Sequence, residues 1–117
     1  MKENRRRSAK IGRMSELIVF LALKLLKDEK EILGFVKVNE PGADFVVTLC
    51  NEQKQRLEVK SSYDGRARHE LHYGKTAAPV VVVHNFRGNM PDRERWKFAT
   101  RIKREVLHTL LCVNHKS

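Results

Sequence analysis

The sequence predicts an α/β domain with a mixed, mostly antiparallel central sheet of about four strands flanked by helices. An apolar helical pattern runs from Ser15 to about Glu31, and a second helix is expected from Pro91 onward. Between them lie alternating or β-branched segments that are typical of strands, at residues 34–38, 44–47, 57–60 and 79–84. At 117 residues the chain has room for one hydrophobic core.

We divide the chain into a basic N-terminal arm, residues 1–13, and a single domain, residues 14–117. The arm is rich in Lys and Arg and almost free of apolar side chains, so we expect it to be disordered in isolation. It could lie along a phosphate backbone, act as a localisation signal or form a solvated tail. The arm residues expected to contact nucleic acid are Arg5, Arg6, Arg7, Lys10 and Arg13.

The charge balance favours a polyanionic partner. The chain has 24 Lys and Arg against 14 Asp and Glu, a formal net charge of +10, which on a small domain indicates nucleic acid without distinguishing DNA from RNA. Its two cysteines argue against a disulfide framework and favour a reducing, intracellular and cytoplasmic compartment. The apolar run from Leu17 to Leu26 is too short for a membrane span, so no membrane partner is expected.

The first predicted helix is apolar on nearly all sides. Such a helix must be covered on more than one side, and we expect part of that cover to come from a second copy in a homodimer. The alternative contact is the last helix, where Leu107 and Leu111 widen the core stripe. The opposite face of that helix carries Lys97, Arg101, Arg104 and His108, which either bind phosphate or form an ordinary charged outer face.

Two neighbouring predicted strands carry two carboxylates and a lysine. Asp44 opens one strand, and Glu58 and Lys60 share one face of the next, because strand side chains alternate. A turn centred near Glu52 would set Asp44 opposite Lys60 and diagonal to Glu58. Converging carboxylates need a cation between them, and oxygen ligands favour Mg²⁺ or Mn²⁺. The lysine can orient water or stabilise phosphate charge, so these groups suit phosphodiester hydrolysis.

Asp44 followed by Glu58-Val59-Lys60 resembles the D…(D/E)xK signature of the PD-(D/E)xK, or restriction-endonuclease-like, nuclease superfamily. The predicted order of helix, strand, Asp strand, ExK strand, helix and strand is the order of the superfamily core. Residues 10–16 are similar to the start of archaeal Holliday-junction resolvases, which have a glycine four residues before a helix glutamate, here Gly12 and Glu16. The resemblance covers residues 10–86 and departs from the pattern at Ala43, where proline is usual, and after Ser62.

This resemblance implies a role for each site residue. Asp44, Glu58 and the backbone carbonyl of Val59 would hold Mg²⁺ or Mn²⁺, Lys60 would position the attacking water, and Glu16 would support that water or a second metal. For Glu16, an alternative is a favourable interaction with the helix dipole from the first helical turn. The remaining residues expected to contact nucleic acid are Ser61, Ser62, Arg66 and Arg68.

The expected function is therefore that of a Mg²⁺-dependent endodeoxyribonuclease that hydrolyses phosphodiester bonds. If the junction-resolvase resemblance holds, two subunits each nick one strand of branched DNA. Two alternatives stay open: a restriction-type nuclease that reads a duplex sequence, and a non-catalytic nucleic-acid-binding protein on the same fold. The motif itself could also be a surface hairpin with ordinary charged residues.

Overall fold

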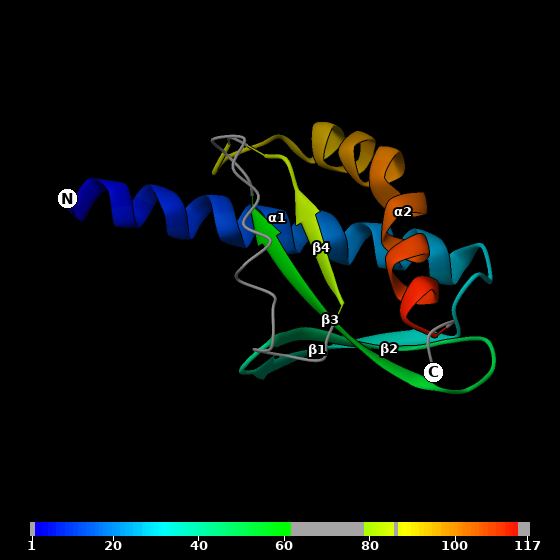
Figure 1. The fold of residues 1–117 in the computed structure, drawn as a ribbon. Helices are drawn as coiled ribbons and strands as arrows, with labels where there is room; N and C mark the ends of the chain where they lie inside the picture. Colours follow the sequence, from blue (N-terminus) through cyan, green and yellow to red (C-terminus); the bar gives the residue numbers. More distant parts are fainter. Residues whose placement is uncertain (1, 62–78, 86, 115–117) are drawn as a thin grey trace.

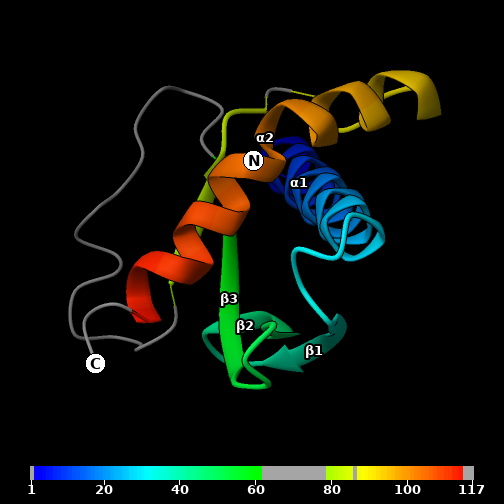
Figure 2. The same ribbon diagram turned by 90° about the vertical axis from the view of Figure 1, so that its right-hand side faces the viewer.

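The computed structural model describes residues 2–61, 79–85 and 87–114. It has an α/β fold, with two helices and a mixed sheet of four strands (Figures 1 and 2). In chain order the elements are α1 (Lys2–Asp28), β1 (Gly34–Glu40), β2 (Ala43–Thr48), β3 (Lys54–Ser61), β4 (Val80–Val83) and α2 (Asp92–Asn114). The helix expected between the ExK strand and β4 falls on residues 62–78, outside the described residues.

Helix α1 begins at Lys2, so the expected helix start at Ser15 is wrong. Over residues 2–13 the basic arm is the N-terminal part of this helix, and its first turns project beyond the rest of the domain (Figure 1). Ile11 and Met14 are buried, and they extend the apolar stripe of the helix toward its N-terminus. The Lys, Arg and Glu residues of this segment are good helix formers, so propensity favours the same continuation.

The strands form one sheet in the order β1-β2-β3-β4. β1 and β2 are antiparallel, β2 and β3 are antiparallel, and β3 and β4 are parallel, which confirms the expected mixed, mostly antiparallel sheet. β3 changes partner along its length: residues 54–57 pair with β2, and residues 58–61 pair with β4. The sheet is therefore split beyond Leu57, as the long diagonal β3 of Figure 1 shows.

The register of the β2–β3 hairpin differs from the expected one. Phe45 pairs with Leu57 and Thr48 with Lys54, so the hairpin is centred at Asn51 instead of Glu52. Asn51 Oδ1 accepts a hydrogen bond from Gln53 N at 3.0 Å, and Glu52 takes a left-handed conformation with φ of 71°. Moving the centre by one residue shifts every pair by two, which brings Asp44 level with Glu58. The prediction that Asp44 lies opposite Lys60 is wrong.

One hydrophobic core joins both helices to one face of the sheet. Phe45, Val47 and Leu57 meet the buried side of α1, and α2 contributes Ala99, Val106 and Leu110. The partly buried side chains of α1 also pack against this core: Leu17, Phe20 and Leu25. The apolar surface of α1 is thus covered within one chain, and it gives no reason to expect a second subunit.

The large apolar side chains that the described residues leave exposed lie elsewhere. They are Leu33, just before the edge strand β1, Val36 within that strand, and Leu111 on α2. Leu111 is on the helix that the sequence offered as the alternative dimer contact. Among the described residues, no helix combines the length and the apolarity that crossing a bilayer requires.

The loop before α2 approaches α1 very closely at Gly88. A Cβ atom added to Gly88 would lie 2.7 Å from Lys10 Cβ and 3.4 Å from the Lys10 carbonyl carbon. Lys10 Cβ is fixed to the helix and cannot swing away, so only glycine fits without moving the loop or the helix. By contrast, a Cβ at Gly12 within α1 would meet no atom within 4 Å.

We predict opposite effects for two glycine-to-alanine substitutions. Gly88→Ala should destabilise the fold by about 1–3 kcal/mol, because the added methyl group overlaps Lys10. Gly12→Ala should stabilise it by up to about 1 kcal/mol, because alanine is the better helix former and nothing obstructs it. Urea unfolding followed by circular dichroism measures both. A Gly88→Ala protein as stable as wild type would show that the loop does not pack on α1 in this way.

Candidate functional site

Asp44 lies where β2 and β3 separate. The strand pairs run from Thr48↔Lys54 to Phe45↔Leu57, and beyond them β3 pairs with β4. At this point the Val59 N–H donates a hydrogen bond to Asp44 Oδ2 at 2.7 Å. The N–H and C=O of one residue in an extended strand point to the same side. The carbonyl oxygen of Val59 therefore faces the side of β3 on which Asp44 lies.

Glu58 and Lys60 flank Val59 and point to the face of β3 opposite the buried Leu57. Glu58 Oε2 is 3.4 Å from Lys60 Nζ, and the two side chains are 15% and 43% exposed respectively. A carboxylate with so little exposure is costly unless positive charge lies beside it, and Lys60 supplies that charge. Asp44 is on the same face, because the register places it level with Glu58.

Glu16 does not lie in the first helical turn, since α1 starts at Lys2, so the interpretation of Glu16 as a helix-dipole residue is wrong. Its Oε1 accepts a hydrogen bond from Lys37 Nζ on β1 at 2.7 Å. Lys37 pairs with Phe45, the neighbour of Asp44, and its Nζ lies 5.3 Å from the centre of that ring. Sequence reasoning missed Lys37, although its register position beside the Asp44 strand is what links Glu16 to the sheet.

A buried polar cluster lies at the ends of the two parallel strands. Ser61 Oγ, at the end of β3, donates to Ser15 Oγ of α1 at 2.5 Å. Asn85 follows β4, and its Nδ2 contacts Ser15 Oγ at 3.5 Å and donates to the Arg87 carbonyl at 2.8 Å. Ser15 and Asn85 are fully buried. Ser61, expected to contact nucleic acid, instead has its hydroxyl engaged in this cluster.

Little in the sequence indicates this cluster. A serine before an apolar helical run is typical of a helix cap, and an asparagine after a β-branched strand is typical of a turn. Only the packing of α1 across the ends of β3 and β4 makes both residues internal.

The remaining nucleic-acid candidates are divided by position. Lys10 and Arg13 are exposed on α1 and line a hollow of about 370 Å³ together with Gly88 and Asn89. Arg5, Arg6 and Arg7 belong to the projecting turns of α1, and their side chains are not among those that the structure describes. Ser62, Arg66 and Arg68 lie outside the described residues.

The carboxylates are not gathered into one three-residue cluster. Among the residues that the structure describes, no group of three or more His, Cys, Asp and Glu side chains is placed to hold a metal ion. The oxygen donors that β2 and β3 do bring together are the carboxylates of Asp44 and Glu58 and the Val59 carbonyl. A donor set of this kind suits a hard cation that keeps several water ligands, as Mg²⁺ does.

Comparisons of the chain with protein-family models, with curated proteins and with solved structures found no significant match. The functional argument therefore depends on the residues and geometry of this chain.

Proposed function

We propose that the chain is a metal-dependent nuclease that hydrolyses phosphodiester bonds in DNA, on a restriction-endonuclease-like fold. The observation that carries this proposal is the 2.7 Å hydrogen bond from Val59 N–H to Asp44 Oδ2. It brings Asp44 to the middle of the Glu58-Val59-Lys60 segment, with both charged side chains on one face of β3. An Asp and an ExK segment brought together in this way are the arrangement that the superfamily signature requires.

The topology supports the same proposal. A helix precedes three antiparallel strands, and a fourth strand lies parallel to the third and is followed by a helix. This order agrees with the superfamily resemblance wherever the residues are described. The parallel β4 stands next to the half of β3 that carries Glu58 and Lys60.

Each residue has a distinct task in the proposed site. Asp44, Glu58 and the Val59 carbonyl would hold Mg²⁺ or Mn²⁺, which when bound would polarise the scissile phosphate and acidify an attacking water. Lys60 keeps its ammonium group 3.4 Å from Glu58, where it would orient that water through a hydrogen bond. Glu16 fixes Lys37 beside the Asp44 strand, on the face of the sheet that carries Phe45, so its task in the proposed site is to hold that strand.

Branched DNA is the substrate form that the Gly12–Glu16 pattern favours. Two active sites nicking two symmetric strands require a homodimer with an isologous interface. Since α1 is covered within one chain, we place that interface at the exposed apolar side chains of β1 or α2, Val36 or Leu111.

A second candidate is a nucleic-acid-binding protein that keeps this fold without cleaving. The observation that favours it is that the acids already have partners within the protein. Asp44 accepts a hydrogen bond from Val59, Glu16 is paired with Lys37, and Glu58 lies beside Lys60. Carboxylates that already have partners could serve only to stabilise the fold. The two candidates therefore differ in whether neutralising Asp44 or Glu58 abolishes a cleavage activity.

The first test removes charge from the carboxylates. Glu58→Gln and Asp44→Asn should each reduce Mg²⁺-dependent cleavage by roughly two orders of magnitude or more, because each replaces a charged metal ligand with a neutral and weaker one. Binding of nucleic acid should be unchanged or tighter, since negative charge near the phosphate is removed. Cleavage is measured on a four-way junction, a duplex, a single strand and RNA, each with Mg²⁺, Mn²⁺ or EDTA.

Glu105→Gln is the matched control, because Glu105 is an exposed glutamate on α2, away from the β2–β3 site. Asparagine keeps an oxygen that can accept the Val59 hydrogen bond, so Asp44→Asn should remain folded. Wild-type rates for Glu58→Gln would refute the active-site assignment. Tight binding with no metal-dependent cleavage of any of the four substrates by the wild-type protein would establish the second candidate.

The second test concerns the basic N-terminal turns of α1. If Arg5, Arg6 and Arg7 bind phosphates, replacing all three with Gln should weaken duplex binding. The slope of log affinity against log salt should then become shallower by about 0.9 for each phosphate that is no longer neutralised. Substitution is preferable to deletion of residues 1–13, because these residues are helical and Ile11 is buried.

The control replaces three exposed basic residues elsewhere, Lys24, Lys27 and Lys54, and so makes the same change in net charge. Fluorescence anisotropy at several salt concentrations measures both proteins. An equal change of slope in the two would assign the effect to net charge alone.

A further inference from the structure

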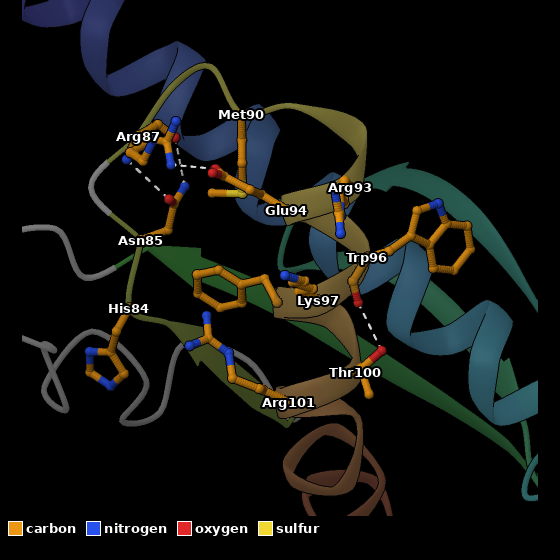
Figure 3. A pocket seen from close by; sticks show the side chains of 11 residues that line it. His84, Asn85, Arg87, Met90, Arg93, Glu94, Trp96, Lys97, Thr100 and Arg101 are labelled. Atoms are coloured by element: carbon orange, nitrogen blue, oxygen red, sulfur yellow. Dashed lines mark hydrogen bonds and ion pairs between the residues drawn. The ribbon is translucent and has the colours of Figure 1, made fainter.

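A groove of about 900 Å³ lies between the segment that follows β4 and the first half of α2 (Figure 3). We call it the α2 groove and define it by six of its lining residues: His84, Arg87, Arg93, Lys97, Phe98 and Arg101. It is separate from the carboxylate site, although His84 connects the two. His84 directly follows β4, two residues beyond Val82, which pairs with Lys60. At about 3.3 Å per residue, the groove begins roughly 7 Å along the chain from that pair.

The rim of the groove is strongly basic. Arg93, Lys97 and Arg101 recur every four residues on α2, so they lie on one side of the helix about 6 Å apart along its axis. All three are exposed, and none is paired with a carboxylate of the described part of the chain. Glu94 is the carboxylate among the lining residues, and it is neutralised by Arg87 at 2.5 Å. Three cations therefore remain to attract an anion.

The floor of the groove is apolar and aromatic. Phe98 is half-buried, packs against the core and has the Arg101 guanidinium 4.9 Å from its ring centre. Met90 is buried in the core against which Phe98 packs, and the half-buried Trp96 directs its ring away from His84 and Asn85 (Figure 3). A guanidinium over an aromatic ring forms a platform on which a planar base can stack.

We propose that the α2 groove binds unpaired nucleotides of a nucleic-acid strand. The phosphates contact Arg93, Lys97 and Arg101, whose spacing is comparable with that of successive phosphates in an extended strand. A base stacks on the Phe98–Arg101 platform. A duplex would engage the basic rim alone, because its bases are stacked on one another, and the apolar floor would remain unused.

Binding of unpaired nucleotides in the α2 groove does not depend on the nuclease chemistry. As a statement about substrate, it rests on the function proposed above: a strand held in the groove leads past His84 to the face that carries Glu58 and Lys60. The substrate would then be DNA with a single-stranded stretch beside the cleaved bond, as at a branch point or flap.

The experiment measures binding in EDTA with the Glu58→Gln protein, so that cleavage plays no part. Labelled oligothymidylate and a duplex of equal length are titrated and followed by anisotropy. The emission of Trp96, the one tryptophan of the chain, reports on the first half of α2 and should change when the single strand binds there. Replacing Arg93, Lys97 and Arg101 with Gln should lower single-strand affinity more than tenfold and make the salt slope shallower by about 2, at roughly 0.7 per phosphate.

Two controls separate the groove from net charge and from folding. The variant with Lys24, Lys27 and Lys54 replaced by Gln carries the same charge change, and its single-strand affinity should fall by less than threefold. Phe98→Leu should lower single-strand affinity roughly tenfold and leave duplex affinity unchanged. Phe98→Tyr, which keeps an aromatic ring, should bind the single strand as tightly as Phe98 does. Thermal unfolding of both Phe98 variants verifies that the core is retained.

Equal losses in the two triple variants would overturn the proposal, as would equal effects of Phe98→Leu on single strand and duplex. An acidic helical peptide that quenches Trp96 more tightly than the oligonucleotide would assign the groove to a protein partner instead. Specific single-strand binding without metal-dependent cleavage would refute the nuclease and keep the groove. Cleavage that is unaffected by the groove variants would keep the nuclease and refute the role of the groove in holding its substrate.

Discussion

β3 exchanges one partner strand for another halfway along its length, and this exchange determines where the candidate site lies. After Leu57 this strand leaves β2 and pairs with β4, so the Val59 N–H needs an acceptor other than a β2 carbonyl. An unsatisfied buried N–H costs about 1–3 kcal/mol, and Asp44 removes that cost with its side chain. The same hydrogen bond brings a carboxylate to the point where the sheet divides. Asp44 thus satisfies the Val59 N–H and is at the same time a candidate catalytic group.

The buried cluster of Ser15, Ser61 and Asn85 fixes α1 against the far end of this divided sheet. Each hydroxyl or amide in it would be unfavourable alone in an apolar core, and together they specify one position of the helix. Because Glu16 is the next residue after Ser15, that position also determines where its carboxylate goes. The helix is therefore held by polar contacts where it passes the site and by apolar contacts where it passes α2.

The strands could be predicted from the sequence because their alternation is local: Phe45, Val47 and Leu57 are buried where the pattern requires. The relation between strands could not, because it depends on a turn. The hydrogen bond of Asn51 and the left-handed Glu52 place the hairpin centre one residue earlier and make Glu58, instead of Lys60, the neighbour of Asp44. The start of α1 escapes prediction for a related reason: residues 2–10 are mostly charged and lack apolar periodicity, so only their helix propensity indicates that the helix continues across them. The α2 groove is visible in the sequence only as a basic stripe, since its floor needs β4 beside α2.

The hydrogen bond of Asp44 is compatible with both functional candidates, because it leaves acceptor positions of the carboxylate free for a metal ion. A carboxylate offers about four acceptor positions on two oxygens, and Val59 N–H occupies one of them on Oδ2. Carboxylates that bind metals are commonly held by such hydrogen bonds, which orient them and reduce the entropy cost when the cation arrives. The contact that looks structural is therefore also the support that a metal ligand needs. What distinguishes the candidates is the charge of Asp44 and Glu58 together: a bound cation needs both negative charges, whereas a protein that only binds phosphate gains nothing from placing them beside it.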